Sequence, residues 1–199
     1  MDKVPVDVAM GGEAGALSVR EASCREHAEI RRLLHAAYAG YASTVPAEVF
    51  PVYLADVLDL SADGATVLVA FDGGAIVGTA RLHVRPTSVD LPAGAAYVRG
   101  VAVRPDREGG GIARALMSGC AERARAAGAT SVYLHTTSFM TRAFRLYRGL
   151  GYVRAPEQDT DSGEHYGVPV EPPLRAFAYR LDLAPPAAGF PRRACGAPS

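Results

Sequence analysis

The sequence contains no tryptophan, no excess of either charge and few cysteines. Lysine plus arginine equals aspartate plus glutamate, 21 of each among 199 residues, so the formal net charge is zero. The basic side chains are scattered along the chain, whereas a nucleic-acid partner or an anionic membrane surface normally requires a basic patch. The composition therefore argues against both of these partners.

The three cysteines, Cys24, Cys120 and Cys195, are far apart and form no CxxC pair. This pattern predicts neither a disulfide framework nor a zinc site, so we expect no metal, and it suits a reducing compartment. The N-terminal residues lack the apolar segment of a secretory signal, and no apolar run approaches the length of a membrane span. We expect a cytoplasmic protein.

Hydrophobic periodicity predicts a mixed α/β domain over residues 16–183. Residues 1–15 are expected to be flexible, and 184–199 to form a Pro-rich disordered tail. Apolar residues at helical spacing predict helices over 26–38, 46–60, 112–128 and 139–150. Apolar, β-branched-rich runs predict strands over 17–22, 65–72, 75–86, 95–103, 131–137, 152–155 and 176–183. Gly100 indicates a bulge or a close backbone approach within its strand, and the polar segment 157–173 is expected to lack regular structure.

Three consecutive glycines, 109–111, separate a predicted strand from a predicted helix. Glycines at this position let backbone N–H groups converge on an anion at the helix N-terminus. A P-loop would require Lys and Ser/Thr next, but Ile112 and Ala113 follow. A dinucleotide fingerprint would require a glycine where Arg114 stands. Neither nucleotide motif fits.

The segment VRPDREGGGIA, residues 103–113, resembles the pyrophosphate-binding motif of the GNAT superfamily of acyl-CoA-dependent N-acetyltransferases, Q/R-x-x-G-x-G/A preceded by V-x-P. The block LHTTSFMTRAFRLYRGLGY, residues 134–152, is similar to a second motif of that family. With the order of elements, the resemblance covers 17–183. It implies an α+β-like GNAT-type fold: a central, mostly antiparallel sheet of about seven strands, flanked by four helices and splayed between the fourth and fifth strands.

The resemblance implies acetyl-CoA as co-substrate, with the pantetheine arm in the splay and the pyrophosphate on the amides of the glycine run. The cofactor-binding residues that it implies are Val101, Ala102, Val103, Glu108, Gly109, Gly110, Gly111, Ile112, Ala113, Arg114, Thr136, Met140, Ala143 and Tyr147. Glu108 departs from the family pattern, because its carboxylate would repel a pyrophosphate. Arg107 or Arg114 would have to compensate, or Glu108 would have to point outward.

Acetyl transfer to an amine needs a neutral nucleophile and a proton for the departing thiolate. Tyr147 matches the tyrosine that acts as general acid in the family; the alternative is that it only packs on the apolar stripe of its helix. Tyr97 occupies the position of a glutamate base in many relatives. His83 and His135 are candidate bases, because histidine titrates near neutrality, although structural histidines and proton loss through ordered water remain alternatives. The oxyanion hole would be backbone N–H near Val101.

The acceptor pocket of this family lies between the first two helices and the segment that joins the last two strands. The candidate pocket residues are Tyr38, Tyr41, Tyr53, Tyr97 and His165, with Phe50 and Tyr166 beside them. We expect direct acetyl transfer to a primary amine of a small molecule. Alternatives are a protein or peptide N-acetyltransferase, a non-catalytic acyl-CoA-binding sensor and, least in keeping with the motif, an ATP-binding regulator. A homodimer is compatible with the resemblance.

Overall fold

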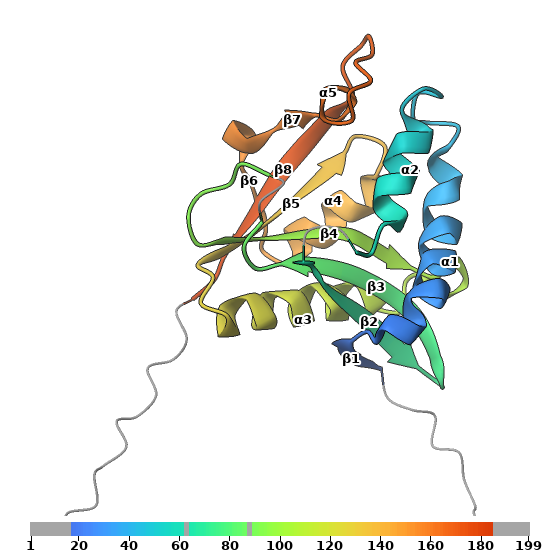
Figure 1. The fold of residues 1–199 in the computed structure, drawn as a ribbon. Helices are drawn as coiled ribbons and strands as arrows, with labels where there is room; N and C mark the ends of the chain where they lie inside the picture. The colour runs from blue at the N-terminus through green and yellow to red at the C-terminus, as the bar shows by residue number, and fades with distance from the viewer. Residues whose placement is uncertain (1–16, 62–63, 87–88, 185–199) are drawn as a thin grey trace, which may run out of the picture.

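The computed structural model describes residues 17–61, 64–86 and 89–184 (Figure 1). The predicted flexible segment 1–15 and all but the first residue of the predicted tail 184–199 lie outside these ranges. The strands are β1 (Ser18–Glu21), β2 (Thr66–Asp72), β3 (Ala75–His83), β4 (Ala95–Val103), β5 (Ser131–Thr137), β6 (Val153–Arg154), β7 (Thr160–Asp161) and β8 (Arg175–Asp182). The α-helices are α1 (His27–Tyr38), α2 (Phe50–Leu58), α3 (Ile112–Ala126), α4 (Thr141–Gly149) and α5 (Ser162–His165).

The strands form one eight-stranded sheet in the order β1-β2-β3-β4-β5-β8-β6, and β7 also pairs with β8. Every pairing is antiparallel except β4 with β5, which is parallel. Those two strands pair only at Ala95 with Ser131, Ala96 with Val132 and Tyr97 with Tyr133. Beyond Tyr97 they run apart, as Figure 1 shows for β4 (green) and β5 (yellow). The predicted mixed fold and its splay are confirmed.

Helices cover both faces of the sheet. In Figure 1, α1 and α2 lie side by side over one face, and α3 lies on the other. One apolar cluster joins α3 and Tyr147 of α4 to the sheet, and a second joins Ile30, Leu34 and Val57 of α1 and α2 to its opposite face. Burying one such aliphatic side chain stabilises the fold by about 1.5–3 kcal/mol. The two layers therefore hold β3 and β4 rigidly between them.

Gly100 forms the predicted bulge in β4. The register with β3 shifts between Thr79 and Arg81, and Gly100 has a φ of +60°. Before the bulge Val98 packs in the α3 layer, and after it Val101 does so instead. The extra residue thus reverses which face of β4 the alternate side chains occupy.

The segment 157–173 differs from the prediction, because it contains α5 and β7. The side chain of Asp161 caps α5 by accepting hydrogen bonds from the backbone N–H groups of Gly163 (2.7 Å) and Glu164 (3.1 Å). Thr160 and Asp161 pair with Ala176 and Arg175 of β8. The composition of this segment, rich in Pro, Gly and Asp, gave no sign of the capped helical turn α5 or of the short strand β7. With β7 the sheet has eight strands instead of the seven predicted.

Candidate active site

The diverging ends of β4 and β5 border a cavity of about 810 Å³. Its walls come from the unpaired half of β4, the glycine run with the first turn of α3, and α4. Tyrosines of α1, α2 and the segment after β7 also line it. A volume in this range suits a small-molecule or cofactor site. Because the strands part at Tyr97, the backbone of β4 beyond it has no neighbouring strand on the β5 side.

The glycine run turns the chain from β4 into α3. Gly109 and Gly111 have φ values of +83° and +76°, which other residues rarely adopt, and Gly111 is the N-cap of α3. On the sheet side, a Cβ on Gly78 of β3 would lie 2.8 Å from Cγ2 of Ile112. This glycine therefore lets the first turn of α3 lie directly against the sheet. The N-terminal residues of α3 border the cavity, where an anion is favoured.

Glu108 forms an ion pair with Arg142 at the start of α4. The expected partners act elsewhere: Arg107 pairs with Asp72, and Arg114 donates to the carbonyl of Gly149 at 3.3 Å. Glu108 and Arg142 both line the cavity, one from each side of the splay. Arg142 therefore offsets the charge of the carboxylate that departs from the family pattern, and it was not foreseen.

Tyr147 lies on α4 with 7% of its surface exposed, and it lines the cavity. Its ring packs against those of Tyr152 and Tyr179, with centroids 5.9 and 6.3 Å away. Burial raises the pKa of its hydroxyl well above the ordinary value, so the phenol stays protonated. The two interpretations of Tyr147 are compatible in this geometry, because the side chain both packs and lines the cavity.

Tyr97 and His135 join β4 to β5 at the splay. The Tyr97 hydroxyl lies 3.0 Å from Nδ1 of His135, and Nε2 of His135 lies 2.7 Å from the carbonyl of Gln158. A carbonyl only accepts, so Nε2 carries the proton and Nδ1 accepts from Tyr97. Burial lowers the pKa of His135, which favours this neutral form. Both side chains line the cavity.

Aromatic rings from α1, α2 and the segments after them gather in the wall of the cavity. Tyr38 packs edge-to-face against Tyr41 and Tyr53, with ring centroids 6.0 and 5.8 Å away. Tyr53 is in turn 6.0 Å from Tyr166. The Tyr38 hydroxyl donates to the carbonyl of Val101 at 3.2 Å. These tyrosines line the cavity, so the structure brings together the predicted acceptor pocket and the predicted cofactor strand.

A charged cluster beside these rings was missing from the sequence prediction. Arg99 of β4 forms an ion pair with Asp56 of α2, and the Tyr166 hydroxyl donates to the same carboxylate oxygen at 3.0 Å. Arg81 of β3 is 1% exposed and donates to the backbone carbonyls of Asp56 and Asp59. Tyr97 and Arg99 are two residues apart on β4. That spacing was the available signal, because residues two apart on a strand point to one face.

Four predicted residues do not line the cavity: His83, Gly110, His165 and Phe50. His83 lies on β3, so Tyr97 of β4 stands between it and the splay, with ring centroids 6.2 Å apart. His165 is exposed beside the ring of Tyr166, which lines the cavity in its place. Gly110 is another of these residues, and a Cβ built on it would lie 3.6 Å from the carbonyl oxygen of Arg107. The other predicted residues all line it.

Within the described residues, His, Cys, Asp and Glu form no group of three that could hold a metal ion. In the same part of the chain, none of the helices has the length and hydropathy needed to cross a membrane.

A sheet splayed at its parallel strand pair, with a glycine-capped helix beside the gap, is the arrangement that the resemblance to acetyltransferases predicted. The model of the acetyltransferase (GNAT) family matches residues 27–152, and the chain belongs to this family. Over 94 residues, or 46% of this chain, it is 34% identical to the mycothiol acetyltransferase of Thermobispora bispora. That match spans about a third of the relative's length, 31%.

Solved structures share the fold at low identity. PaiA N-acetyltransferase of Thermoplasma acidophilum, in complex with coenzyme A, is 14% identical with a TM-score of 0.63, over 84% of this chain and 99% of that one. YncA of Salmonella typhimurium, a putative acetyltransferase with its cofactor acetyl-CoA, is 22% identical with a TM-score of 0.60, over 89% and 99%. The ribosomal-protein-S18-alanine N-acetyltransferase of Escherichia coli is 15% identical with a TM-score of 0.59, over 87% and 98%. These likenesses agree with the family and the fold.

Proposed function

We propose that this acetyltransferase moves the acetyl group of acetyl-CoA directly to a primary amine of a small molecule. The observation that carries the proposal is the cavity that joins the unpaired half of β4, the glycine-capped start of α3 and Tyr147 to a pocket of tyrosines. Two solved structures of the same fold are described with acetyl-CoA or coenzyme A. We further propose that residues 16–183 act as one domain in the cytoplasm.

Acetyl-CoA would occupy the cavity with its pantetheine arm along β4 between Val101 and Val103. Its pyrophosphate would lie on the amides of residues 109–114, where the dipole of α3 favours negative charge. Side chains on the glycine run would obstruct that approach. Arg142 is close to this end of the cavity and, once released from Glu108, would be a cation for the phosphates. Thr136, Met140 and Ala143 would line the other side of the arm.

The transfer needs one proton to move from the amine to the sulfur. The amine nitrogen attacks the thioester carbonyl carbon, the N–C bond forms, and the C–S bond of the tetrahedral intermediate breaks. Tyr147 would donate a proton to the departing sulfur and act as general acid. Tyr97 would accept the proton that the nitrogen of the neutral amine loses once the N–C bond has formed, while its own proton passes to Nδ1 of His135. Backbone N–H near Val101 would stabilise the oxyanion.

His83 is left out of this scheme, because it lies one strand away from the splay. His135 is retained, since it reaches the cavity through Tyr97. A protein or peptide acceptor is a second candidate function, favoured by the likeness to the S18-alanine N-acetyltransferase fold. The rings of Tyr38, Tyr41 and Tyr53 support a small acceptor instead, because bulky aromatic side chains take up part of the cavity wall.

The first test is thermal unfolding with acetyl-CoA, CoA, ATP and NADH. A ligand at 100 times its dissociation constant stabilises a protein by about 2.7 kcal/mol, which raises the midpoint by roughly 5–10 °C for a domain of this size. We expect this shift with the two CoA species alone. Stabilisation by ATP and not by CoA would instead favour the nucleotide-binding regulator.

The second test is CoA release with a panel of amines and peptides. Tyr147→Phe should lower turnover at least tenfold and leave CoA binding intact, since general acids contribute about 10²–10⁴-fold. Tyr152→Phe is the matched control, because its buried hydroxyl has no hydrogen-bond partner among the described residues. CoA binding without turnover of any amine or peptide would support the sensor and contradict the proposal.

A further inference from the structure

The charges on the walls of the cavity are mostly positive. Among the described residues, the charged side chains that line it are Arg99, Arg107, Glu108, Arg114, Arg142 and Arg145. The one carboxylate in this set, that of Glu108, belongs to the glycine-run end and is paired with Arg142. Arg99 is the charged lining residue next to the tyrosines, because its partner Asp56 accepts from Tyr166. In the described part of the chain, Glu108 is the one acidic side chain that lines the cavity, so no unpaired carboxylate there can receive a second ammonium group.

Arg99 is held in place by a network that leaves part of its guanidinium available. One of its nitrogens, Nη2, pairs with Asp56, whose Oδ2 also accepts from Tyr166. The remaining N–H groups of Arg99 make no hydrogen bond to another described residue, and the side chain is 15% exposed. These donors are therefore available to a ligand in the cavity. Planar N–H groups in this position suit a carboxylate.

Arg81 supports the position of Arg99 from the next strand. The two arginines are paired residues of β3 and β4, and Arg81 donates to backbone carbonyls of Asp56 and Asp59. A Cβ on Gly100 would lie 3.0 Å from Nε of Arg81, so the glycine bulge makes room for this buried guanidinium. The cluster contains two arginines and the two aspartates. Of these four side chains, only Arg99 borders the cavity.

We propose that the acceptor is an amine that also bears a carboxylate, as a free amino acid does, and that Arg99 binds this carboxylate. The inference rests on the proposed function. Tyr97 and Arg99 are two residues apart on β4, about 7 Å along the strand, so an amine at Tyr97 leaves its carboxylate within reach of Arg99. The rings of Tyr38, Tyr53 and Tyr166 would surround an apolar or aromatic side chain.

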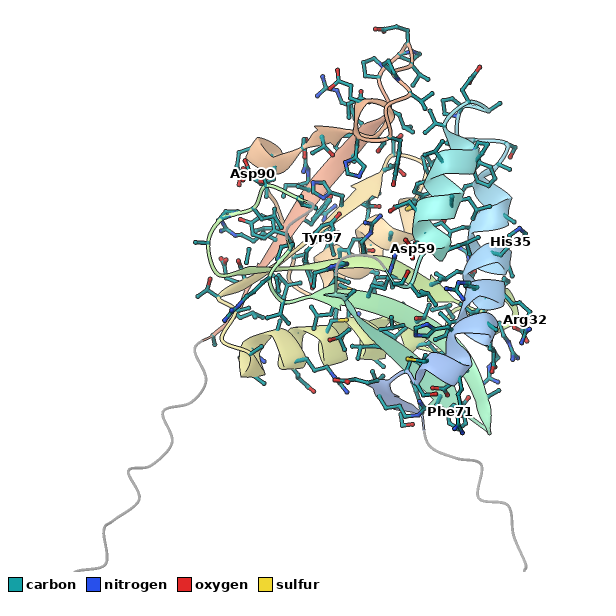
Figure 2. All side chains as sticks on the ribbon, in the orientation of Figure 1. Arg32, His35, Asp59, Phe71, Asp90 and Tyr97 are labelled. Carbon is teal, nitrogen blue, oxygen red and sulfur yellow. The ribbon has the colours of Figure 1, made fainter. Side chains whose placement is uncertain are left out.

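The experiment compares phenylalanine, phenylalaninamide and phenethylamine as acceptors, which differ only at the carboxylate position. Rates of CoA release are expressed per fraction of unprotonated amine, because the three amines titrate at different pH. The variants are Arg99→Gln, which removes the charge, and Arg99→Lys, which keeps a charge opposite Asp56 but has no planar fork. Arg32→Gln is the matched control, because Arg32 is exposed on the outer face of α1 (Figure 2). A melting temperature for each variant monitors folding.

For the wild type we expect kcat/KM for phenylalanine to exceed that for the amide and for phenethylamine at least tenfold, since hydrogen bonds to charged groups are strong. Arg99→Gln should shrink this ratio to about one, Arg99→Lys should reduce it partly, and Arg32→Gln should leave it unchanged. A wild-type ratio near one, or a preference for the amide, overturns the Arg99 assignment while the proposed function stands. Turnover of other amines of the panel but of none of these three overturns the Arg99 assignment alone, whereas CoA binding without turnover of any amine or peptide overturns the proposed function, and the Arg99 assignment with it.

Discussion

The hydroxyl of Tyr97 lies 3.0 Å from Nδ1 of His135, and this hydrogen bond bridges β4 and β5 at the residue where the two strands part. The carbonyl of Gln158 fixes the tautomer by accepting from Nε2 of His135 at 2.7 Å. The accepting nitrogen is thereby directed at the hydroxyl of Tyr97, which also lines the cavity. In the proposed mechanism, the neutral histidine would take a proton through Tyr97.

Tyr97→Phe and His135→Gln should each lower kcat/KM about 10–100-fold, within the contribution expected of a general base. The pH profile separates catalysis from packing. In the wild type, the slope of log kcat/KM against pH should steepen from about one to about two below pH 6.5, because the acceptor amine and His135 must both be deprotonated. In either variant the slope should stay near one. A slope of two in both variants would exclude the relay.

Stability should also depend on the protonation of His135. Its pKa is lowered by burial in the folded protein, whereas the unfolded chain binds the proton at the ordinary value of about 6.5. Below that pH the unfolded state binds more protons, so the free energy of unfolding falls as the pH falls. Urea unfolding at pH 7.5, 6.5 and 5.5 should show this loss, and His135→Gln should make it smaller. His35→Gln, at an exposed histidine of α1 (Figure 2), serves as the control; an equal change there would contradict the assignment.

Gly100→Ala should destabilise the protein more than Gly73→Ala. Both glycines have positive φ, +60° and +56°, so each substitution carries a backbone cost of about 1–3 kcal/mol. Only at Gly100 does the added Cβ also meet an obstacle, Nε of Arg81 at 3.0 Å, whereas the space around Gly73 is open. Denaturant unfolding measures both costs. Gly100→Ala should in addition lower CoA release, because it moves the bulge of β4. Equal costs would mean that the guanidinium of Arg81 moves aside freely.

Glu108→Gln should lower the KM for acetyl-CoA a few-fold, since it removes a negative charge from the proposed pyrophosphate site and releases Arg142. Arg142→Gln should raise it, and both effects should fade at high salt, because the two side chains are exposed to solvent and salt screens exposed charges. Glu122→Gln is a matched control, an exposed glutamate of α3 about 15 Å along the helix from its start. A raised KM in Glu108→Gln would instead indicate that Glu108 positions Arg142 for the phosphates.

Local patterns in the sequence were sufficient where neighbouring residues decide the structure. The expected strands 95–103 and 131–137 have the observed bounds of β4 and β5, because their apolar residues are close together and are ended by turn residues. The bulge at Gly100 was also predicted, since glycine weakens a regular strand and is favoured where the backbone bends. The short β7 and α5 were not, because an aspartate cap and a two-residue pairing leave little periodicity to detect.

The residues of the candidate site also fall into those that local sequence patterns predicted and those that they did not. Its glycine run and Tyr147 were found in the sequence, because short motifs carry them. The partners of its charged and titratable groups were not, because they are separated by 34 residues for Glu108 and Arg142, 38 for Tyr97 and His135, and 110 for Asp56 and Tyr166.

The sequence by itself determined the family, the order of the main elements and the glycine turn into α3, since each depends on residues that are close in the chain. The tertiary structure alone decided that Tyr97 meets His135, that Arg142 offsets Glu108, and that Arg99 borders the cavity beside Asp56. The physical reason is that strand order, register and the packing of helices against the sheet set these distances, and a local pattern of side chains encodes none of them.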